Sequence, residues 1–168
     1  MPTGSARNDA PSIRDDVVGA FAMKEHRAFR RANDQVYAIV GANPAMKIVS
    51  DTWFGRYDSQ IEFQQVLTHI LDLFRGGRYS YWLADIRMMA TDFRDSERWL
   101  VSYLMPEMIK AGLVREAVVV PDETVQVEGE DVFRTASSAL RTIADGRVRA
   151  FKDIKLARQW LLEGALPG

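Results

Sequence analysis

The chain has 168 residues with no cysteine, a net charge of −1 and a hydrophobic fraction of 47%. A chain of this length buries about 70% of the surface that its unfolded form exposes, so we expect one packed domain. The composition excludes disulfide bonds, thiolate metal ligands, cysteine nucleophiles and a general electrostatic attraction to nucleic acid. It contains no apolar run of about 18 residues, so we expect no integral membrane association. Because the N-terminus lacks the apolar segment of a secretory signal, the predicted location is cytoplasmic.

Residues 1–34 are predicted to form a flexible leader in front of the main domain. A helix is predicted over residues 13–31, because Ile13, Val17 and Phe21 recur at four-residue spacing. The segment ends with several basic residues, and a basic amphipathic helix can lie on an acidic partner or a membrane surface. The alternative is a helix that docks loosely on the domain.

Two β-strands are predicted to open the main domain, which we place at residues 35–168. Residues 36–40 are β-branched or aromatic, residues 41–44 have the composition of a turn, and residues 45–54 have the pattern of a second strand. The connection is too short for a crossover helix, so the two strands should form an antiparallel hairpin. Both faces of the second strand carry apolar residues, which indicates burial from two sides.

A helix is predicted to follow the hairpin, because the apolar period changes from two residues to about 3.6. Ser59 and Glu62 match the capping box, in which each side chain bonds a free backbone N–H of the other's turn. The glycine pair at residues 76–77 should end this helix. The apolar residues 79–86 then form a strand.

A polar loop and a second helix, from residue 96 to residue 111, are expected next. Pro106 lies inside this helix, where it removes one N–H donor and clashes with the preceding turn. We therefore expect a kink there, or two short helices.

The alternation of strand and helix then continues to the C-terminus. Residues 113–120 are predicted as a strand, residues 130–145 as a helix and residues 148–151 as the last strand, while Asp153 caps a final helix that ends at Gly164. Strands that alternate with single helices pair in parallel through right-handed crossovers. The predicted fold class is therefore α/β: a mixed, mostly parallel sheet of about five strands, flanked by helices and opening with an antiparallel hairpin.

Open sheets of this kind bind ligands beyond the carboxyl ends of their parallel strands. The segment after the strand at residues 79–86 carries the polar residues Asp85, Arg87, Thr91, Asp92 and Ser96. Asp85 has two interpretations: a phosphoryl acceptor or metal anchor, or an ion-pair partner of Arg87. Thr91 and Ser96 are either phosphorylation switches at a helix N-terminus or, like Asp92, helix caps.

A receiver domain would also place an aspartate at the end of a middle strand and a lysine after the last strand, as Asp85 and Lys152 stand here. That fold needs an acidic pair after its first strand to hold Mg²⁺, since hard cations require oxygen ligands. Here the first strand is followed by the turn at residues 41–44. We therefore exclude a receiver domain.

No catalytic constellation is found in the sequence. The only histidines, His26 and His69, are not spaced as a metal-binding pair, and no nucleophile elbow, P-loop or dinucleotide-binding glycine motif occurs. We expect no enzymatic activity, no metal ion and no cofactor.

Four stretches follow one another in a characteristic order: YWLADIR, AGLVREAVVVP, VRAF and DIKLARQWLLEG. Together with the hairpin, this order resembles the STAS/SpoIIAA-like domain family, and in particular bacterial STAS-like proteins, over residues 35–164. The resemblance implies a mixed sheet with helices chiefly on one side, and a regulatory or ligand-binding role rather than turnover. Anti-anti-sigma members are switched by phosphorylation of a serine in a D-S-[ST]-G-type motif. This chain has DIRMMATDFRDSE there, so the switch does not carry over to Thr91 or Ser96.

Two functional hypotheses follow. The first is a non-enzymatic regulatory protein–protein interaction domain, with a protein partner or a second copy of the chain in a homodimer. The second is a small-molecule or lipid-binding module with an aromatic-lined pocket for a small apolar ligand, as the resemblance to the wider superfamily of CRAL-TRIO lipid carriers implies. The candidate partner- or ligand-binding residues are Asp85, Arg87, Thr91, Asp92, Ser96, Trp99 and Tyr103.

Two structural features would discriminate between these hypotheses. An exposed apolar patch on the helix after Asp85 favours an interaction domain. An enclosed cavity of about 300 Å³ or more favours a ligand-binding module. The aromatic residues that would line it, or would instead pack in the core, are Tyr79, Tyr81, Trp82, Trp99, Tyr103 and Trp160.

Overall fold

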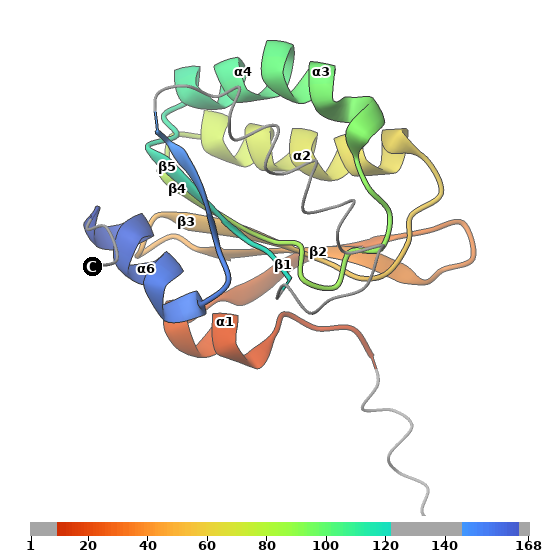
Figure 1. Ribbon diagram of the computed structural model, residues 1–168, viewed down its shortest axis with the longest axis horizontal. Coiled ribbons are helices and arrows are strands. Elements are labelled where there is room, and N and C mark those ends of the chain that lie inside the picture. The colour runs from red at the N-terminus through yellow and green to blue at the C-terminus, as the bar shows by residue number, and fades with distance from the viewer. Residues whose placement is uncertain (1–9, 122–145, 165–168) are drawn as a thin grey trace, which may run out of the picture.

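A computed structural model describes residues 10–121 and 146–164 of the chain. The described residues form one sheet of six strands, which lie side by side in the order in which they occur in the sequence (Figure 1). The strands are β1 (Lys24–Arg30), β2 (Val36–Asn43), β3 (Ile48–Trp53), β4 (Tyr81–Asp85), β5 (Arg115–Val119) and β6 (Val148–Phe151). The helices are α1 (Asp15–Phe21), α2 (Gln60–Arg75), α3 (Glu97–Trp99), α4 (Met105–Lys110) and α6 (Ile154–Glu163).

The sheet is mixed. Strands β1, β2 and β3 pair antiparallel, and strands β3, β4, β5 and β6 pair parallel. Because α2 and the α3–α4 segment connect strands that advance along the sheet in one direction, right-handed crossovers place both on the same face. Figure 1 shows α2, α3 and α4 as one layer above the sheet, with α1 and α6 below it. The predicted α/β class, the opening hairpin and the mostly parallel pairing are confirmed.

The sheet has a buried core on each face. On β3, Val49 and Trp53 pack toward the α2–α4 layer, whereas Ile48 belongs to the core beneath α1 and α6. All six residues of β3 are buried, as the apolar character of both its faces predicted. A polar side chain on either face of the central strands is therefore buried, and its burial costs free energy unless it is hydrogen-bonded.

The prediction of one helix over residues 13–31 was wrong in its second half. Helix α1 ends at Phe21, Ala22 adopts a left-handed conformation with φ of 49°, and residues 24–30 form β1. This strand raises the number of strands to six instead of about five. Its charged residues, Lys24, Glu25, Arg27 and Arg30, resembled a basic helix face, but they lie on an edge strand, where charges prevent pairing with another sheet.

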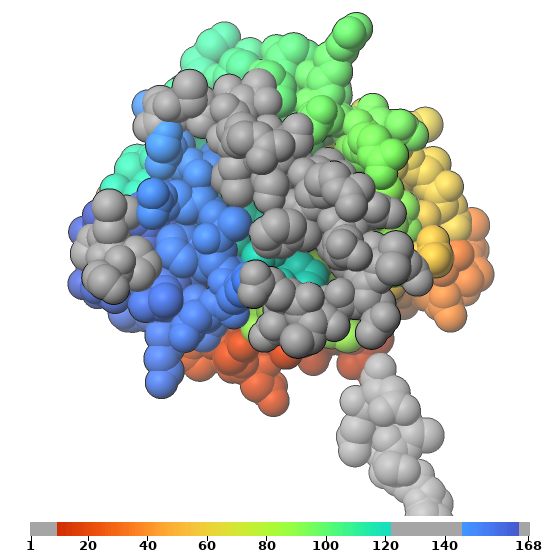
Figure 2. Space-filling model, viewed as in Figure 1, coloured from red at the N-terminus to blue at the C-terminus, as the bar shows by residue number. Residues whose placement is uncertain are grey.

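The segment before β1 is packed on the sheet instead of forming a loosely attached leader. At Gly41 of β2, a Cβ atom would lie 2.7 Å from the Cδ1 of Ile13 and 2.8 Å from the Cγ of Met23. Only glycine allows this close approach. On the same face, the Nε of Arg158 in α6 donates to the carbonyl of Ala20 at 2.7 Å. Figure 2 shows the N-terminal residues in red along the lower border of the blue β6 and α6.

Local signals in the sequence set the boundaries of the helices. The capping box of Ser59 and Glu62 begins α2, and the carboxylate of Asp153 accepts the backbone N–H of Lys155 at 2.7 Å at the start of α6. Before Pro106 the helix widens into a π turn, Leu100–Leu104, between α3 and α4, so two short helices, one of the two expected outcomes, are observed. The helix predicted at residues 130–145 lies outside the described residues.

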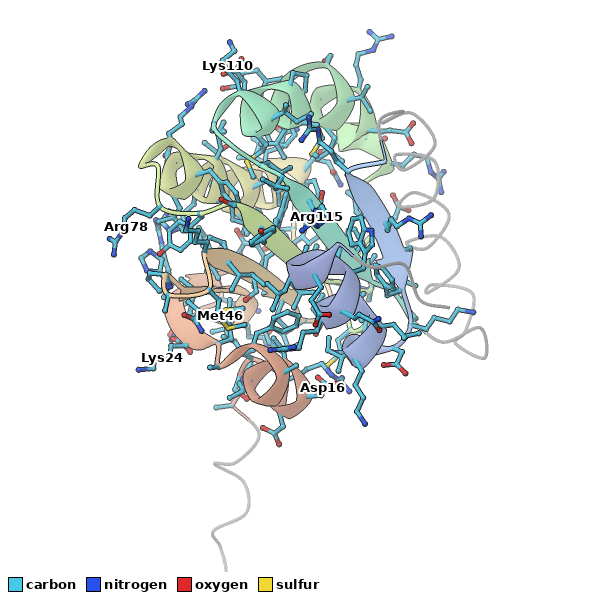
Figure 3. The ribbon with its side chains drawn as sticks, turned by 90° about the vertical axis from the view of Figure 1, so that its left-hand side faces the viewer. Asp16, Lys24, Met46, Arg78, Lys110 and Arg115 are labelled. Atoms are coloured by element: carbon cyan, nitrogen blue, oxygen red, sulfur yellow. The ribbon has the colours of Figure 1, made fainter. Side chains whose placement is uncertain are left out.

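Side chains also tie the two termini of the fold to the central strands. Arg115 extends from β5 to α6, where its Nε donates to the carbonyl of Leu161 at 3.0 Å (Figure 3).

Among the helices of residues 10–121 and 146–164, none has the length and apolar character needed to cross a membrane.

Candidate functional site

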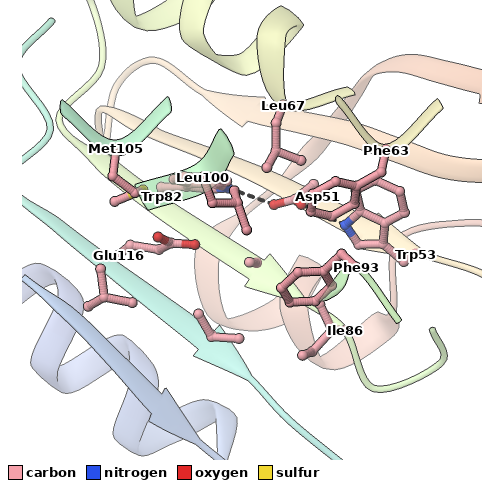
Figure 4. A pocket seen from close by; sticks show the side chains of 13 residues that line it. Asp51, Trp53, Phe63, Leu67, Trp82, Ile86, Phe93, Leu100, Met105 and Glu116 are labelled. Atoms are coloured by element: carbon pink, nitrogen blue, oxygen red, sulfur yellow. Dashed lines mark hydrogen bonds between the residues drawn. The ribbon is translucent and has the colours of Figure 1, made fainter. Parts of the chain in front are cut away.

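A cavity of about 70 Å³ lies between the central strands and the α2–α4 layer (Figure 4). Its wall is apolar except for the side chains of Asp51 and Glu116. We call it the carboxyl cavity. The described residues that line it are Asp51, Trp53, Phe63, Leu67, Trp82, Ala84, Ile86, Phe93, Leu100, Met105, Glu116, Val118 and Val148.

The strand register brings both carboxyl groups to one face of the sheet. Asp51 of β3 is paired with Ala84 of β4, and Glu116 of β5 is paired with Trp82 of β4. Side chains two residues apart on a strand point to the same face, so Trp82 and Ala84 share a face. The two acids therefore lie on either side of β4, beneath the helical layer.

Asp51 is held by two indole groups. It is 2% exposed, and its two carboxyl oxygens accept one indole N–H each, from Trp53 and Trp82, both at 2.6 Å. Burial raises the pKa of Asp51 to about 6, although the two indole hydrogen bonds oppose that rise and the charge of Asp85 adds to it. The side chain of Asp51 is therefore fixed in position and close to its titration point at neutral pH.

Glu116 lies across the cavity and is 6% exposed. No donor among the described residues reaches its carboxyl group; only its backbone N–H is bonded, to the carbonyl of Arg147 at 2.8 Å. Burial raises the pKa of Glu116 well above its ordinary value, and the nearby charge of Asp51 raises it further. Burial therefore favours the neutral form of Glu116, which can donate one hydrogen bond into the cavity.

The rest of the wall consists mainly of aromatic rings. Phe63 of α2 and Phe93 stack with their centroids 4.9 Å apart, and Trp53 lies 5.3 Å from Phe63. No lysine, arginine or histidine is found among the described residues of the wall. The cavity thus combines apolar ring surfaces with two acidic groups, and the described residues of its wall include no basic side chain to pair with them.

The polar residues predicted at the end of β4 do not line the cavity. Asp85 is 1% exposed, and its carboxylate accepts the Nε and Nη2 of Arg87, each at 2.9 Å. The same guanidinium donates to Asp16 of α1 at 2.7 Å and 3.0 Å. This hydrogen bond lowers the pKa of Asp16. Asp85 is thus the ion-pair partner of Arg87, which was one of its two interpretations. Through Arg87 it anchors an ionic network that attaches α1 to β4.

The remaining loop residues are engaged in contacts with the start of α2. The hydroxyl of Thr91 accepts the backbone N–H of Tyr57 at 3.2 Å, and the carboxylate of Asp92 accepts the backbone N–H of Arg94 at 3.0 Å. Ser96 is fully buried, donates to Gln60 at 2.6 Å and accepts from Gln64 at 3.1 Å. A kinase cannot reach Ser96 in this packed state. Partner binding by these residues stays a prediction.

Of the aromatic residues expected around a pocket, Trp82 is the one that lines the carboxyl cavity. The rings of Trp99 and Tyr103 have centroids 6.0 Å apart, with Tyr103 exposed and Trp99 partly buried against the core, and Trp160 packs on Phe151 on the other face of the sheet. The function of Trp99 and Tyr103 as a docking surface is likewise a prediction.

The sequence analysis missed both carboxyl residues of the cavity. Asp51 interrupts an apolar strand between the buried residues Val49 and Trp53, and Glu116 lies two residues before the buried Val118. An acid at such a position signals a buried carboxyl group, and that signal is present in the sequence. What the sequence does not contain is the register that places the two acids around Trp82.

No described set of three histidine, aspartate or glutamate residues is arranged to hold a metal ion. His26 and His69 stack with their ring centroids 5.3 Å apart. Comparison of the chain with known protein families, with curated proteins and with solved structures found no match.

Proposed function

We propose that this protein binds a small, largely apolar molecule in the carboxyl cavity, with Glu116 as its polar anchor. The observation that carries the proposal is the carboxyl group of Glu116, which is buried at a cavity wall without a donor or acceptor among the described residues. A ligand group would supply the missing partner.

The energetic argument concerns the cost of that carboxyl group in the folded state. A buried polar group that makes no hydrogen bond costs about 1–3 kcal/mol, and more when it is ionised. An apolar residue at position 116 would avoid this cost, because its strand neighbours on the same face, Val118 and Trp82, are already apolar. Retention of such a group at a cavity wall is typical of a functional site.

The size of the cavity limits the ligand. Its volume of about 70 Å³ is well below the 300 Å³ or so expected of a pocket for a drug-sized molecule or lipid chain. An apolar cavity of about 150 Å³ accommodates benzene. The volume therefore favours a molecule of a few heavy atoms over a lipid.

The aromatic wall determines which part of the ligand faces which residue. Its apolar body would pack against Phe63, Phe93 and Trp53. Each Å² of apolar surface that is removed from water in this way contributes about 25 cal/mol to the binding free energy. Its polar group would face Glu116 on the opposite side. Binding alone accounts for this arrangement, so the proposal includes no chemical reaction.

Proton–nitrogen correlation NMR on the full chain tests the proposal. The four tryptophan residues give four indole signals, of which Trp53 and Trp82 report on the cavity. We expect fragments of up to about five heavy atoms to shift these two signals and leave those of Trp99 and Trp160 unchanged. Absence of any fragment that shifts the Trp53 and Trp82 signals selectively would contradict the proposal.

A pair of matched variants assigns the effect to the anchor. Glu116→Met keeps the approximate volume of the side chain, removes its polar atoms and should weaken binding of fragments that bear a polar group. Glu107→Met makes the same chemical change on α4, where Glu107 pairs with Arg75 outside the cavity, and should leave binding unchanged. Equal effects of the two variants would place the bound fragment away from Glu116.

A further inference from the structure

The geometry points to a specific ligand class: a small primary ammonium ion with a compact apolar body, whose nitrogen is bound between Glu116 and Asp51. This inference rests on the proposed function and deepens it. It is argued from the supply of donors and acceptors, the charge, the ring surfaces and the volume of the carboxyl cavity.

The cavity offers acceptors but almost no free donors. Both indole N–H groups at its wall are already used by Asp51, one on each carboxyl oxygen. Each carboxyl oxygen has two lone pairs, so each oxygen of Asp51 can accept one more hydrogen bond, and both oxygens of Glu116 are unoccupied among the described residues. An ammonium group carries three N–H donors and no acceptor. It therefore satisfies the polar atoms that the fold leaves without partners.

The charge of the cavity favours a cation. Its described wall contains two acids and no basic side chain, and the rest of that wall is apolar. In such surroundings a carboxylate ligand would be repelled by Asp51, while an ammonium ion would compensate it. The wall also presents the faces of Trp53, Trp82, Phe63 and Phe93, and aromatic faces attract cations.

Binding of an ammonium ion is coupled to a proton. Burial favours the neutral form of Glu116 in the empty cavity and a bound cation favours the ionised form, so ion-pair formation with the ligand releases a proton from the carboxyl group. The groups that face Glu116 are Asp51 from β3, Trp82 from β4, Met105 from α4 and Val148 from β6. Asp51 is the only titratable one among them. The affinity for the amine should therefore rise from pH 6 to pH 8.

Titrations with matched ligands provide the test. Propylamine and isobutylamine are each compared with the alcohol and the carboxylate of the same carbon skeleton, and the indole signals of Trp53 and Trp82 are the readout. We expect the better-fitting amine to bind at least about tenfold more tightly than its alcohol, because hydrogen bonds to charged groups contribute about 1.5–3 kcal/mol. The carboxylates should not shift these signals.

The variants separate this inference from the proposed function. Glu116→Gln should reduce amine affinity about tenfold or more and leave the affinity of the alcohol within about twofold, while Glu107→Gln should change neither. An alcohol that binds in the cavity as tightly as its amine, or an amine affinity that falls from pH 6 to pH 8, would overturn the ammonium inference and leave small-molecule binding intact. Failure of every ligand in both skeleton series to shift the two indole signals would contradict both.

Discussion

Trp82 and Glu116 are direct partners in the register between β4 and β5, yet the indole N–H of Trp82 bonds Asp51 on the opposite side, at 2.6 Å. The two acids of the carboxyl cavity therefore have different surroundings. Asp51 has two charge-stabilising donors, and Glu116 has none among the described residues. This asymmetry makes Asp51 a structural support and leaves Glu116 available to a ligand.

Replacement of Glu116 by methionine should stabilise the protein. Methionine has a similar volume and removes a buried carboxyl group that has no partner, so we expect the free energy of unfolding to rise by about 1–3 kcal/mol. Chemical denaturation at pH 7 measures the change. A loss of stability in Glu116→Met, with no such loss in Glu107→Met, would show that Glu116 has a structural partner and is not a free anchor.

The raised pKa of Asp51 predicts a specific pH dependence. Its pKa is about 6 in the folded state and 3.8 in a model peptide, so the folded state binds more protons between these values. The stabilising contribution of protonated Asp51 is fully present below pH 4 and is lost as the pH rises through about 6, a change of about 3 kcal/mol.

Comparison of wild type with Asp51→Asn isolates this contribution. Asparagine does not ionise, so the stability of the variant relative to wild type should improve by up to about 3 kcal/mol between pH 4 and pH 7. The variant should be less stable at pH 4, because one side-chain oxygen replaces the two that accept the indole N–H groups. Parallel stability curves across this pH range would contradict the assignment.

The loss of stability on disrupting the ionic network at the end of β4 should depend on which of its residues is replaced. Arg87→Leu leaves the buried carboxylate of Asp85 without its partner, and we expect a loss of about 3–5 kcal/mol. Asp16→Asn removes only the partly exposed side of the network and should cost about 1 kcal/mol or less. Thermal unfolding of the two variants provides the comparison. Equal losses would mean that Asp85 is not anchored by Arg87.

Two glycine substitutions test the packing of the N-terminal segment on the sheet. Gly41→Ala places a methyl group against Ile13 and Met23, so it should destabilise the protein by about 1–3 kcal/mol. Gly19 lies in α1 with no atom near the position of an added Cβ, and Gly19→Ala should stabilise by about 0.5–1 kcal/mol. If Gly41→Ala were as well tolerated as Gly19→Ala, the segment at Ile13 would not pack against β2 in solution.

Much of the fold could be predicted because its signals are local. The hairpin of β2 and β3, the capping box at Ser59, the irregular helix before Pro106 and the cap at Asp153 each follow from a few neighbouring residues. The strand β1 was missed because it lies at the edge of the sheet and only Phe29 among its residues is buried, so no alternating apolar pattern identifies it.

The site was harder to predict because it depends on contacts between strands. Asp85 and its neighbours stood at the expected edge of the sheet, but their charges are satisfied within the chain. Asp51 and Glu116 become a pair only through the register of β3, β4 and β5, which sequence periodicity does not determine.

The central claim is that a small ligand occupies the carboxyl cavity. Nuclear Overhauser contacts between the methyl protons of bound isobutylamine and the protein test it most directly, since they locate the ligand itself. We predict contacts to the ring protons of Phe63, Phe93 and Trp82, and their loss in Glu116→Gln at the same ligand concentration. Contacts confined to Trp99 and Tyr103, which do not line the cavity, would contradict the claim.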